Sequence, residues 1–179
     1  DQVQIDEHWL FEVGRHRINP SAMTNLHSVT LRVDSPLAAS LVTRLPNVTR
    51  LEADSQFWQV ADAAAAAYQR VEKLSCGFPC LQRAAQSQAL RKSLTEFECR
   101  SSCTYRASRL SAELAKFPNL SALTIPSSLM RDFAIFFQPL SLSTLRVELT
   151  TTEEDGEGLN AFNARALTKL ELVYLQNDN

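Results

Sequence analysis

Glycine is scarce in this sequence, with 4 residues among 179, and neither sign of charge dominates it. So little glycine excludes fibrous chains and flexible linkers as classes for the protein. The 18 lysine and arginine residues are balanced by 20 aspartate and glutamate residues, which leaves a net charge of -2 at pH 7. Because there is no excess of cations to displace the counterions of a phosphate backbone, we expect no nucleic-acid partner.

Long apolar runs are missing as well. No stretch approaches the roughly 20 apolar residues that cross a bilayer, and residues 1–20 are too polar for a signal peptide. We therefore expect no membrane insertion. The proportions of hydrophobic residues, 45%, and charged residues, 21%, are ordinary for a globular protein, so a single domain over residues 1–179 is the simplest expectation.

Catalytic signatures are absent from the sequence. It contains no G-x-S-x-G elbow, no G-x-x-x-x-G-K phosphate loop and no H-E-x-x-H zinc motif. Only His8, His16 and His27 could act as general bases near neutral pH, and solvated or capping histidines are the simpler interpretation. We expect no enzymatic activity and no cofactor.

An internal repeat is the strongest signal that is present. A phrase of the form L-x-x-L-x-L occurs seven times, and successive copies begin 22 to 26 residues apart. The middle apolar residues of the seven copies are Val29, Leu51, Leu74, Phe97, Leu123, Leu145 and Leu170. Self-similarity at such a period indicates a stack of repeated structural units.

Each phrase predicts a short strand, and each interval between phrases predicts a helix. Apolar and polar residues alternate at the end of the phrase, which is the period of a strand with one buried face. Between phrases the apolar residues recur at helical spacing, in stretches 37–45, 61–68, 110–117 and 129–140. Connections this short force successive strands to lie parallel, with the helices on one side.

This pattern resembles the leucine-rich-repeat family over residues 26–179. The resemblance implies an α/β solenoid, with a curved parallel sheet on the concave face and short helices on the convex face. Residues 1–25 fit the phase badly, so we expect them to form an N-terminal cap or a degenerate repeat. No capping helix follows Leu172, and we expect a truncated last repeat in a longer natural protein.

One family feature is missing. The Asn or Cys that commonly follows the third apolar position by three residues is replaced at Asp34, Gln56, Pro79, Ser102, Ser128, Thr150 and Leu175. The turns must therefore find other hydrogen-bond partners. A Pro-Asn pair does precede two of the strands, and its asparagines, Asn47 and Asn119, also lie in N-x-S/T sequons. We favour a structural role for them and an intracellular, cytoplasmic protein; glycosylation of a secreted protein is the alternative.

The four cysteines form two CxxxC pairs one repeat apart, and three interpretations are open. Cys76 and Cys99 occupy third apolar positions, where we expect small buried hydrophobes. Stacking of the repeats would also place Cys76 beside Cys99 and Cys80 beside Cys103, within the reach of disulfides. A four-thiolate zinc site is the third possibility. On the first interpretation, chelation leaves the fold intact.

The resemblance also implies which residues meet a partner, because in this family the residues flanking the middle apolar position point out of the concave sheet. One such ladder is Ser28, Arg50, Lys73, Glu96, Ala122, Thr144 and Lys169, and the other is Thr30, Glu52, Ser75, Glu98, Thr124, Arg146 and Glu171. From these ladders the candidates for partner binding are Arg50, Glu52, Lys73, Ser75, Glu96, Glu98 and Arg146.

The function implied by the resemblance is a non-catalytic scaffold or adaptor that binds a protein partner on the concave sheet. Its mixed charges and lack of aromatic anchors favour recognition through charge complementarity. The alternatives are a solvated sheet without a partner, the substrate-receptor segment of an F-box type ubiquitin ligase, and a regulator of an enzyme such as a GTPase activator. No F-box is visible in the sequence.

Overall fold

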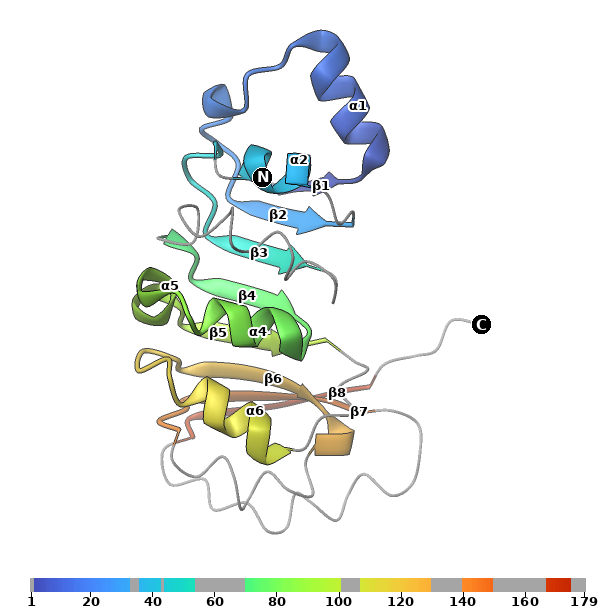
Figure 1. The fold of residues 1–179 in the computed structure, drawn as a ribbon. Coiled ribbons are helices and arrows are strands. Elements are labelled where there is room, and N and C mark those ends of the chain that lie inside the picture. The colour runs from blue at the N-terminus through green and yellow to red at the C-terminus, as the bar shows by residue number, and fades with distance from the viewer. Residues whose placement is uncertain are drawn as a thin grey trace.

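A single parallel sheet organises the fold. The structure is a computed structural model and describes residues 2–32, 36–42, 44–53, 70–100, 107–129, 140–149 and 167–174. Its eight strands lie side by side in the order of the sequence, all parallel. They are β1 (Gln2–Ile5), β2 (Ser28–Leu31), β3 (Arg50–Ala53), β4 (Lys73–Cys76), β5 (Glu96–Cys99), β6 (Ala122–Pro126), β7 (Thr144–Leu149) and β8 (Lys169–Tyr174). The class is α/β, as predicted (Figure 1).

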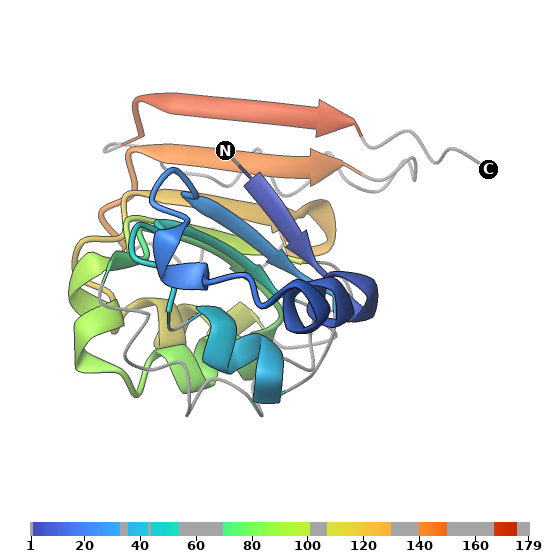
Figure 2. The ribbon, with the colours of Figure 1, turned by 90° about the horizontal axis from the view of Figure 1, so that it is seen from above.

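The helices gather on one face of this sheet. They are α2 (Pro36–Val42), α4 (Phe78–Ala84), α5 (Gln88–Ser93), α6 (Ala107–Leu114) and the 3-10 turn η3 (Ser127–Leu129). Figure 2, which looks down the row of strands, places α2, α4, α5 and α6 on the same side. The helices expected at 37–45 and 110–117 correspond to α2 and α6. The stretch 61–68 and most of 129–140 lie outside the described residues.

The seven predicted strands are confirmed, and their register follows the repeat. Each middle apolar residue pairs with the next, from Val29 to Leu170. Side chains alternate between the two faces of a strand, so from β1 to β7 one face of every layer supplies apolar residues to a continuous core. Phe97 is the largest of the fully buried side chains in this core.

The first strand is an element that the repeat pattern did not predict. β1 pairs with β2 and continues the same register, with Val3 beside Val29. The helix α1 (Glu7–His16) begins after Asp6, whose carboxylate accepts a hydrogen bond from the Trp9 amide at 2.8 Å. It ends at Arg17, which adopts the left-handed conformation with φ of 50°. The 3-10 turn η1 (Pro20–Ala22) then leads to β2.

Polar side chains just before the strands link successive layers. The side-chain amides of Asn47 and Asn119 donate to backbone carbonyls of the preceding layer, at 2.6 Å to Thr24 and 2.7 Å to Lys92. Hydroxyl groups do the same one residue before four of the strands, from Thr95, Ser121, Ser143 and Thr168, over 3.0 to 3.4 Å. The turns without Asn or Cys lie at the other ends of the strands, and of those seven positions only Pro79 and Ser128 are described, so the expectation for them stays a prediction.

The cysteines of the described chain are buried thiols. Cys76 and Cys99 are neighbours in register, both fully buried, and no disulfide joins them. Cys80 is buried on α4. The expectation of small buried hydrophobes is confirmed for Cys76 and Cys99, and a disulfide between these two is wrong. Cys103 lies outside the described residues, and within them no group of three or more ligands could hold a metal ion.

Candidate interaction surface

One face of the sheet lies opposite the helices α2, α4, α5 and α6, and we call it the open face. It carries mostly polar side chains in register. Its first row is Gln2, Ser28, Arg50, Lys73, Glu96, Ala122, Thr144 and Lys169, and its second is Gln4, Thr30, Glu52, Ser75, Glu98, Thr124, Arg146 and Glu171. These rows contain both ladders expected from the sequence. All seven candidate residues therefore lie on one surface, extended on β1 by Gln2 and Gln4.

Arg100 joins three strands across the middle of the open face. It follows the last residue of β5 and reaches back over β4, where its Nε donates to the Ser75 hydroxyl at 2.9 Å. Its Nη1 lies 2.5 Å from Oε1 of Glu52 on β3, and its Nε lies 3.6 Å from Oε1 of Glu98. Ser75 lies beneath this guanidinium and is only 4% exposed. Arg100 thus fixes the positions of candidate side chains from β3, β4 and β5.

Two further cations complete the charged network. Nη2 of Arg32, at the end of β2, lies 3.7 Å from the same Glu52 oxygen that Arg100 binds. Nζ of Lys73 lies 3.5 Å from a carboxylate oxygen of Glu96 and 3.9 Å from one of Glu98. Charges of both signs therefore largely offset one another between β2 and β5. Each pair is partly solvated and contributes little to stability by itself.

Arg50 stands apart from this network. It is exposed at the start of β3 and lies beside Lys73 in the first row. Within the described part of the chain no ion pair forms at Arg50, although its neighbour Lys73 contacts two carboxylates. Its guanidinium is thus the candidate cation best placed to meet a negatively charged group from another molecule.

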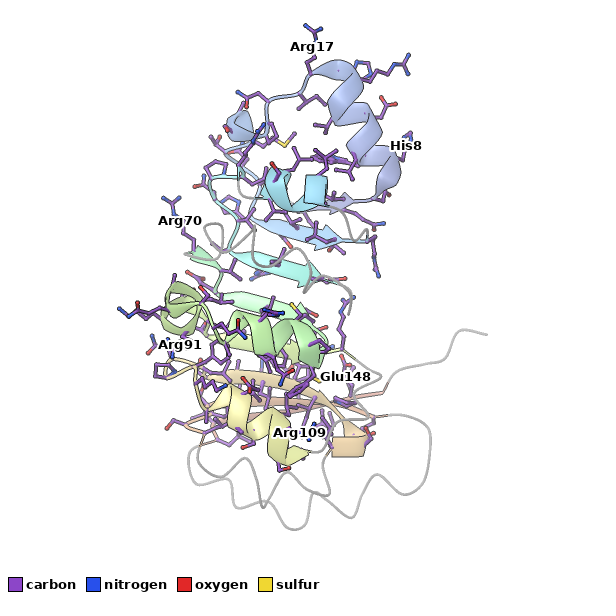
Figure 3. The ribbon with its side chains drawn as sticks, in the orientation of Figure 1. His8, Arg17, Arg70, Arg91, Arg109 and Glu148 are labelled. Carbon is purple, nitrogen blue, oxygen red and sulfur yellow. The ribbon has the colours of Figure 1, made fainter. Side chains whose placement is uncertain are left out.

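Glu148 and Arg146 form the other charged part of the open face, on β7. Partial burial raises the pKa of Glu148 above its usual 4.5, and the negative charge of Glu98 raises it further. The positive charges of Arg146 and Arg100 act in the opposite direction. Nε of Arg146 is buried without a hydrogen-bond partner among the described residues. Figure 3 labels Glu148 close to the end of its strand.

The raised pKa of Glu148 predicts an increase in stability when its charge is removed. Because the folded state favours the protonated carboxyl, wild type loses stability as pH rises from below 4.5 through the raised pKa. We expect Glu148→Gln to raise the free energy of unfolding at pH 7 by less than about 1 kcal/mol, since solvent screens this half-exposed group. The gain should vanish at pH values below the pKa of the unfolded chain. Urea unfolding at pH 7 and at pH 3.5 measures both.

Glu171 provides the control with the opposite sign. A hydrogen bond from Lys169, followed by the charge of that lysine, lowers the pKa of Glu171. Its ionised form therefore stabilises the fold above the unfolded pKa, and Glu171→Gln should lower stability at pH 7. Equal effects of both substitutions at pH 7 would contradict the interpretation of Glu148.

The sequence did not point to Arg32, Arg100 or Glu148. Each of them lies two residues after a residue of the second row and therefore points to the same face. Together with Pro126 they form a third row of the open face. The signal that could have found them is the same period of two residues, continued past the last apolar position of the phrase. Arg100 contacts three of the candidates, Glu52, Ser75 and Glu98.

The histidines form no cluster with the open-face residues. Nε2 of His16 lies 3.0 Å from a carboxylate oxygen of Glu12, one turn earlier on α1, and the imidazole is well exposed. Nδ1 of His27 lies 2.9 Å from the Asn25 carbonyl, and His8 is exposed on α1. All three positions fit the expectation of solvated or capping histidines.

Comparisons with protein-family profiles, with curated proteins and with solved structures found no match. Among the helices described by the structure, none is long and apolar enough to cross a membrane.

Proposed function

We propose that the chain is a leucine-rich-repeat solenoid whose open face is the concave surface, and that it acts as a non-catalytic scaffold for a protein partner. The observation that carries this proposal is the pair of polar rows running in register across all eight strands. Such rows present side chains at steps of ~4.8 Å on a rigid sheet, which suits a macromolecule better than a small ligand.

The partner is a protein with carboxylates placed opposite Arg50. Lys73 already contacts Glu96 and Glu98, whereas Arg50 beside it has its charge available. The fixed network around Arg100 leaves the carboxylates of Glu52 and Glu98 partly neutralised, so a partner cannot gain much by approaching them with cations. Recognition through such a surface gives specificity and a fast association rate rather than high affinity.

The two sequons support a location where they are not glycosylated, inside the cell. The Nδ2 atoms of Asn47 and Asn119 are the atoms that a glycan would modify, and both donate to backbone carbonyls of the neighbouring layer. A glycan would replace one of the two N–H hydrogens on each Nδ2, directly beside the contact between layers. A cytoplasmic location is part of this proposal.

The test is a double charge reversal, Arg50→Glu with Lys73→Glu, in the full-length protein. A partner recovered by affinity purification with wild type should bind the double variant at least tenfold more weakly, and with a weaker dependence on salt. Stability should fall only modestly, because Arg50 is exposed and the ion pairs of Lys73 are partly solvated, even though the new carboxylate at position 73 lies beside Glu96 and Glu98. Titration calorimetry over a range of salt concentrations measures both the affinity and its salt dependence.

The matched control reverses two basic residues on the helical side, Lys92→Glu on α5 and Arg109→Glu on α6. Both are exposed, and Figure 3 shows Arg109 on α6. The control should bind the partner as wild type does, and so should variants at Arg83 and Gln88, on α4 and α5. If the helical variants abolish binding while the Arg50 and Lys73 reversal does not, the open face is not the binding surface.

A further inference from the structure

The two ends of the sheet are complementary to each other. Among the strands that the structure describes, β1 and β8 are the outermost, and each pairs with only one neighbour. At the β8 end two large apolar side chains are exposed, Leu170 at 47% and Leu172 at 44%. Their neighbours in register on β7, Leu145 and Val147, are completely buried. The apolar rows of the core thus continue to the edge of β8 without being covered among the described residues.

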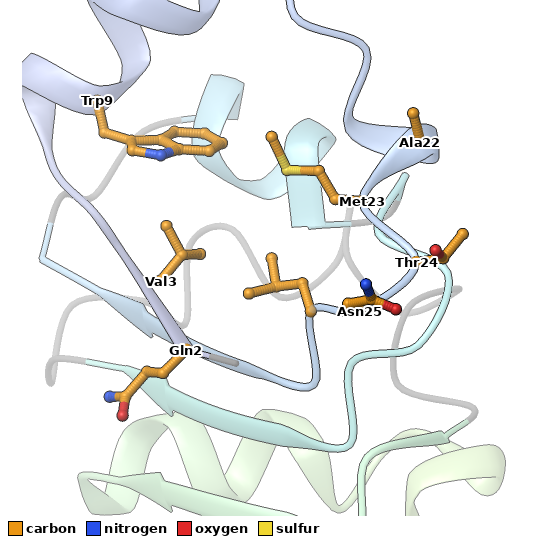
Figure 4. Close-up of a pocket in the computed structure, with 8 residues that line it drawn as sticks. Gln2, Val3, Trp9, Ala22, Met23, Thr24 and Asn25 are labelled. Carbon is orange, nitrogen blue, oxygen red and sulfur yellow. The ribbon is translucent and has the colours of Figure 1, made fainter.

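At the β1 end the corresponding apolar row stops beside a pocket. The pocket has a volume of about 330 Å³ and borders Gln2 and Val3 of β1. Trp9 from α1 and Met23 from the segment after η1 form its other walls (Figure 4). Val3 is the β1 member of the row that ends with Leu170 on β8. The pocket therefore lies next to the position where one more layer would place an apolar side chain.

The unpaired backbone groups of the two edges also match. The Arg32 amide donates to the Ile5 carbonyl, so the backbone N–H and C=O of Ile5 point toward β2. Because these groups alternate in direction along a strand, the N–H and C=O of Gln2 and Gln4 point toward the free edge. On β8 the Lys169 amide donates to the Ser143 carbonyl, so the backbone groups of Lys169 point toward β7. By the same alternation, the N–H and C=O of Leu170 point toward the free edge of β8. In Figure 2, which looks down on the β1 end, no other ribbon crosses β1, the dark-blue strand that begins at the N-terminus.

We propose that β8 of one copy of this chain pairs in parallel with β1 of a second copy and that Leu170 enters the pocket beside Trp9. The Gln4 amide then donates to the carbonyl of Leu170 in the other copy, as each strand of the sheet does to the one before it. On the open face, the Lys169 and Glu171 pair comes to lie beside the uncharged Gln2 and Gln4, so like charges do not meet. The contact is head to tail, and it leaves a free end on each copy.

Two variants block one end each. Gln4→Pro removes the outward amide of β1 without removing a hydrogen bond to β2, and the extended backbone of an edge strand tolerates proline. Leu170→Lys with Leu172→Lys places charge on the exposed apolar edge of β8, a device that prevents edge pairing. The matched control is Leu37→Lys, because Leu37 is 54% exposed but lies on the helix α2 and not on either edge strand. Circular dichroism melting confirms that each variant is folded.

Sedimentation velocity on the variants and their mixture tests the proposal. Wild type and the Leu37→Lys control should associate beyond the monomer mass of 20.0 kDa as concentration rises. Each end-blocked variant should lose this association when alone. Mixed in equal amounts, they should form a dimer that grows no further, because the β8 edge of the proline variant and the β1 edge of the lysine variant are both intact.

A second measurement uses a synthetic peptide of residues 167–174 as the probe. In a Trp58→Phe background the fluorescence of Trp9 should change as the peptide fills the pocket, and Gln4→Pro should abolish the change. Association of the proline variant alone would show pairing between two β8 edges and overturn the proposal. A monomeric wild type whose Trp9 does not respond to the peptide would overturn it as well.

Discussion

Replacing Leu123 by aspartate should unfold the protein. Leu123 is 1% exposed at the centre of β6, with Phe97 and Leu145 beside it in register. An aspartate there has no cation and little water to stabilise its charge, and it also removes the apolar contact between two layers. We expect a loss of more than about 4 kcal/mol, a large part of the stability of a typical domain. The near-ultraviolet circular dichroism and the cooperative melting transition should disappear.

The control for this substitution is the next residue along the strand. Thr124 points to the open face and is partly exposed, so Thr124→Asp introduces the same charge into the same strand with access to solvent. It should cost about 1 kcal/mol or less, mainly through the low strand propensity of aspartate. A Leu123→Asp protein that keeps the wild-type melting transition would contradict the assignment of Leu123 to the core.

Truncating Phe97 to alanine should have the second largest effect. Phe97 is the largest fully buried side chain among the described residues, and it lies between Leu74 and Leu123 in the middle of the sheet. Alanine leaves a cavity that flanking layers cannot fill without shifting their strands, so we expect a loss of about 3 to 5 kcal/mol. For a chain of this size the melting temperature should fall by roughly 6 to 20 °C. Differential scanning calorimetry measures both quantities.

Phe97→Leu separates the cavity from the loss of the aromatic ring. Leucine occupies the same row in both neighbouring layers, so the variant should lose only about 1 to 2 kcal/mol. If alanine and leucine prove equally destabilising, the volume of the side chain is not what Phe97 contributes.

The sheet could be predicted from the sequence because one apolar residue in each layer must face the same core. The positions of Val29 to Leu170 follow from that requirement alone, and alternation along a strand then predicts which polar residues share the opposite face. Register is strongly determined in such a sheet, since a slip by one residue would exchange buried and exposed side chains. This is why the two predicted ladders match the first two rows of the open face.

The parts that could not be predicted depend on contacts between side chains rather than on period. β1 consists of Gln-Val-Gln-Ile, which contains no leucine and only half of the repeat phrase, so the pattern was too short to detect. Arg100 owes its place to its length, because its guanidinium lies two strands away from its own backbone. The hydroxyl ladder at Thr95 and Ser121 was missed because serine and threonine are common in turns of many kinds.

The sequential order of the strands also determines how the molecule would respond to a pulling force along the stack. Every strand is bonded only to its neighbours, so the ladders between β1 and β8 would carry such a load in series, like links of a chain. These links differ in strength, since three paired positions join β3 to β4 and β5 to β6, whereas six join β7 to β8. Tension would therefore open the sheet in its middle, between β3 and β4 or between β5 and β6, before it detached the β8 end.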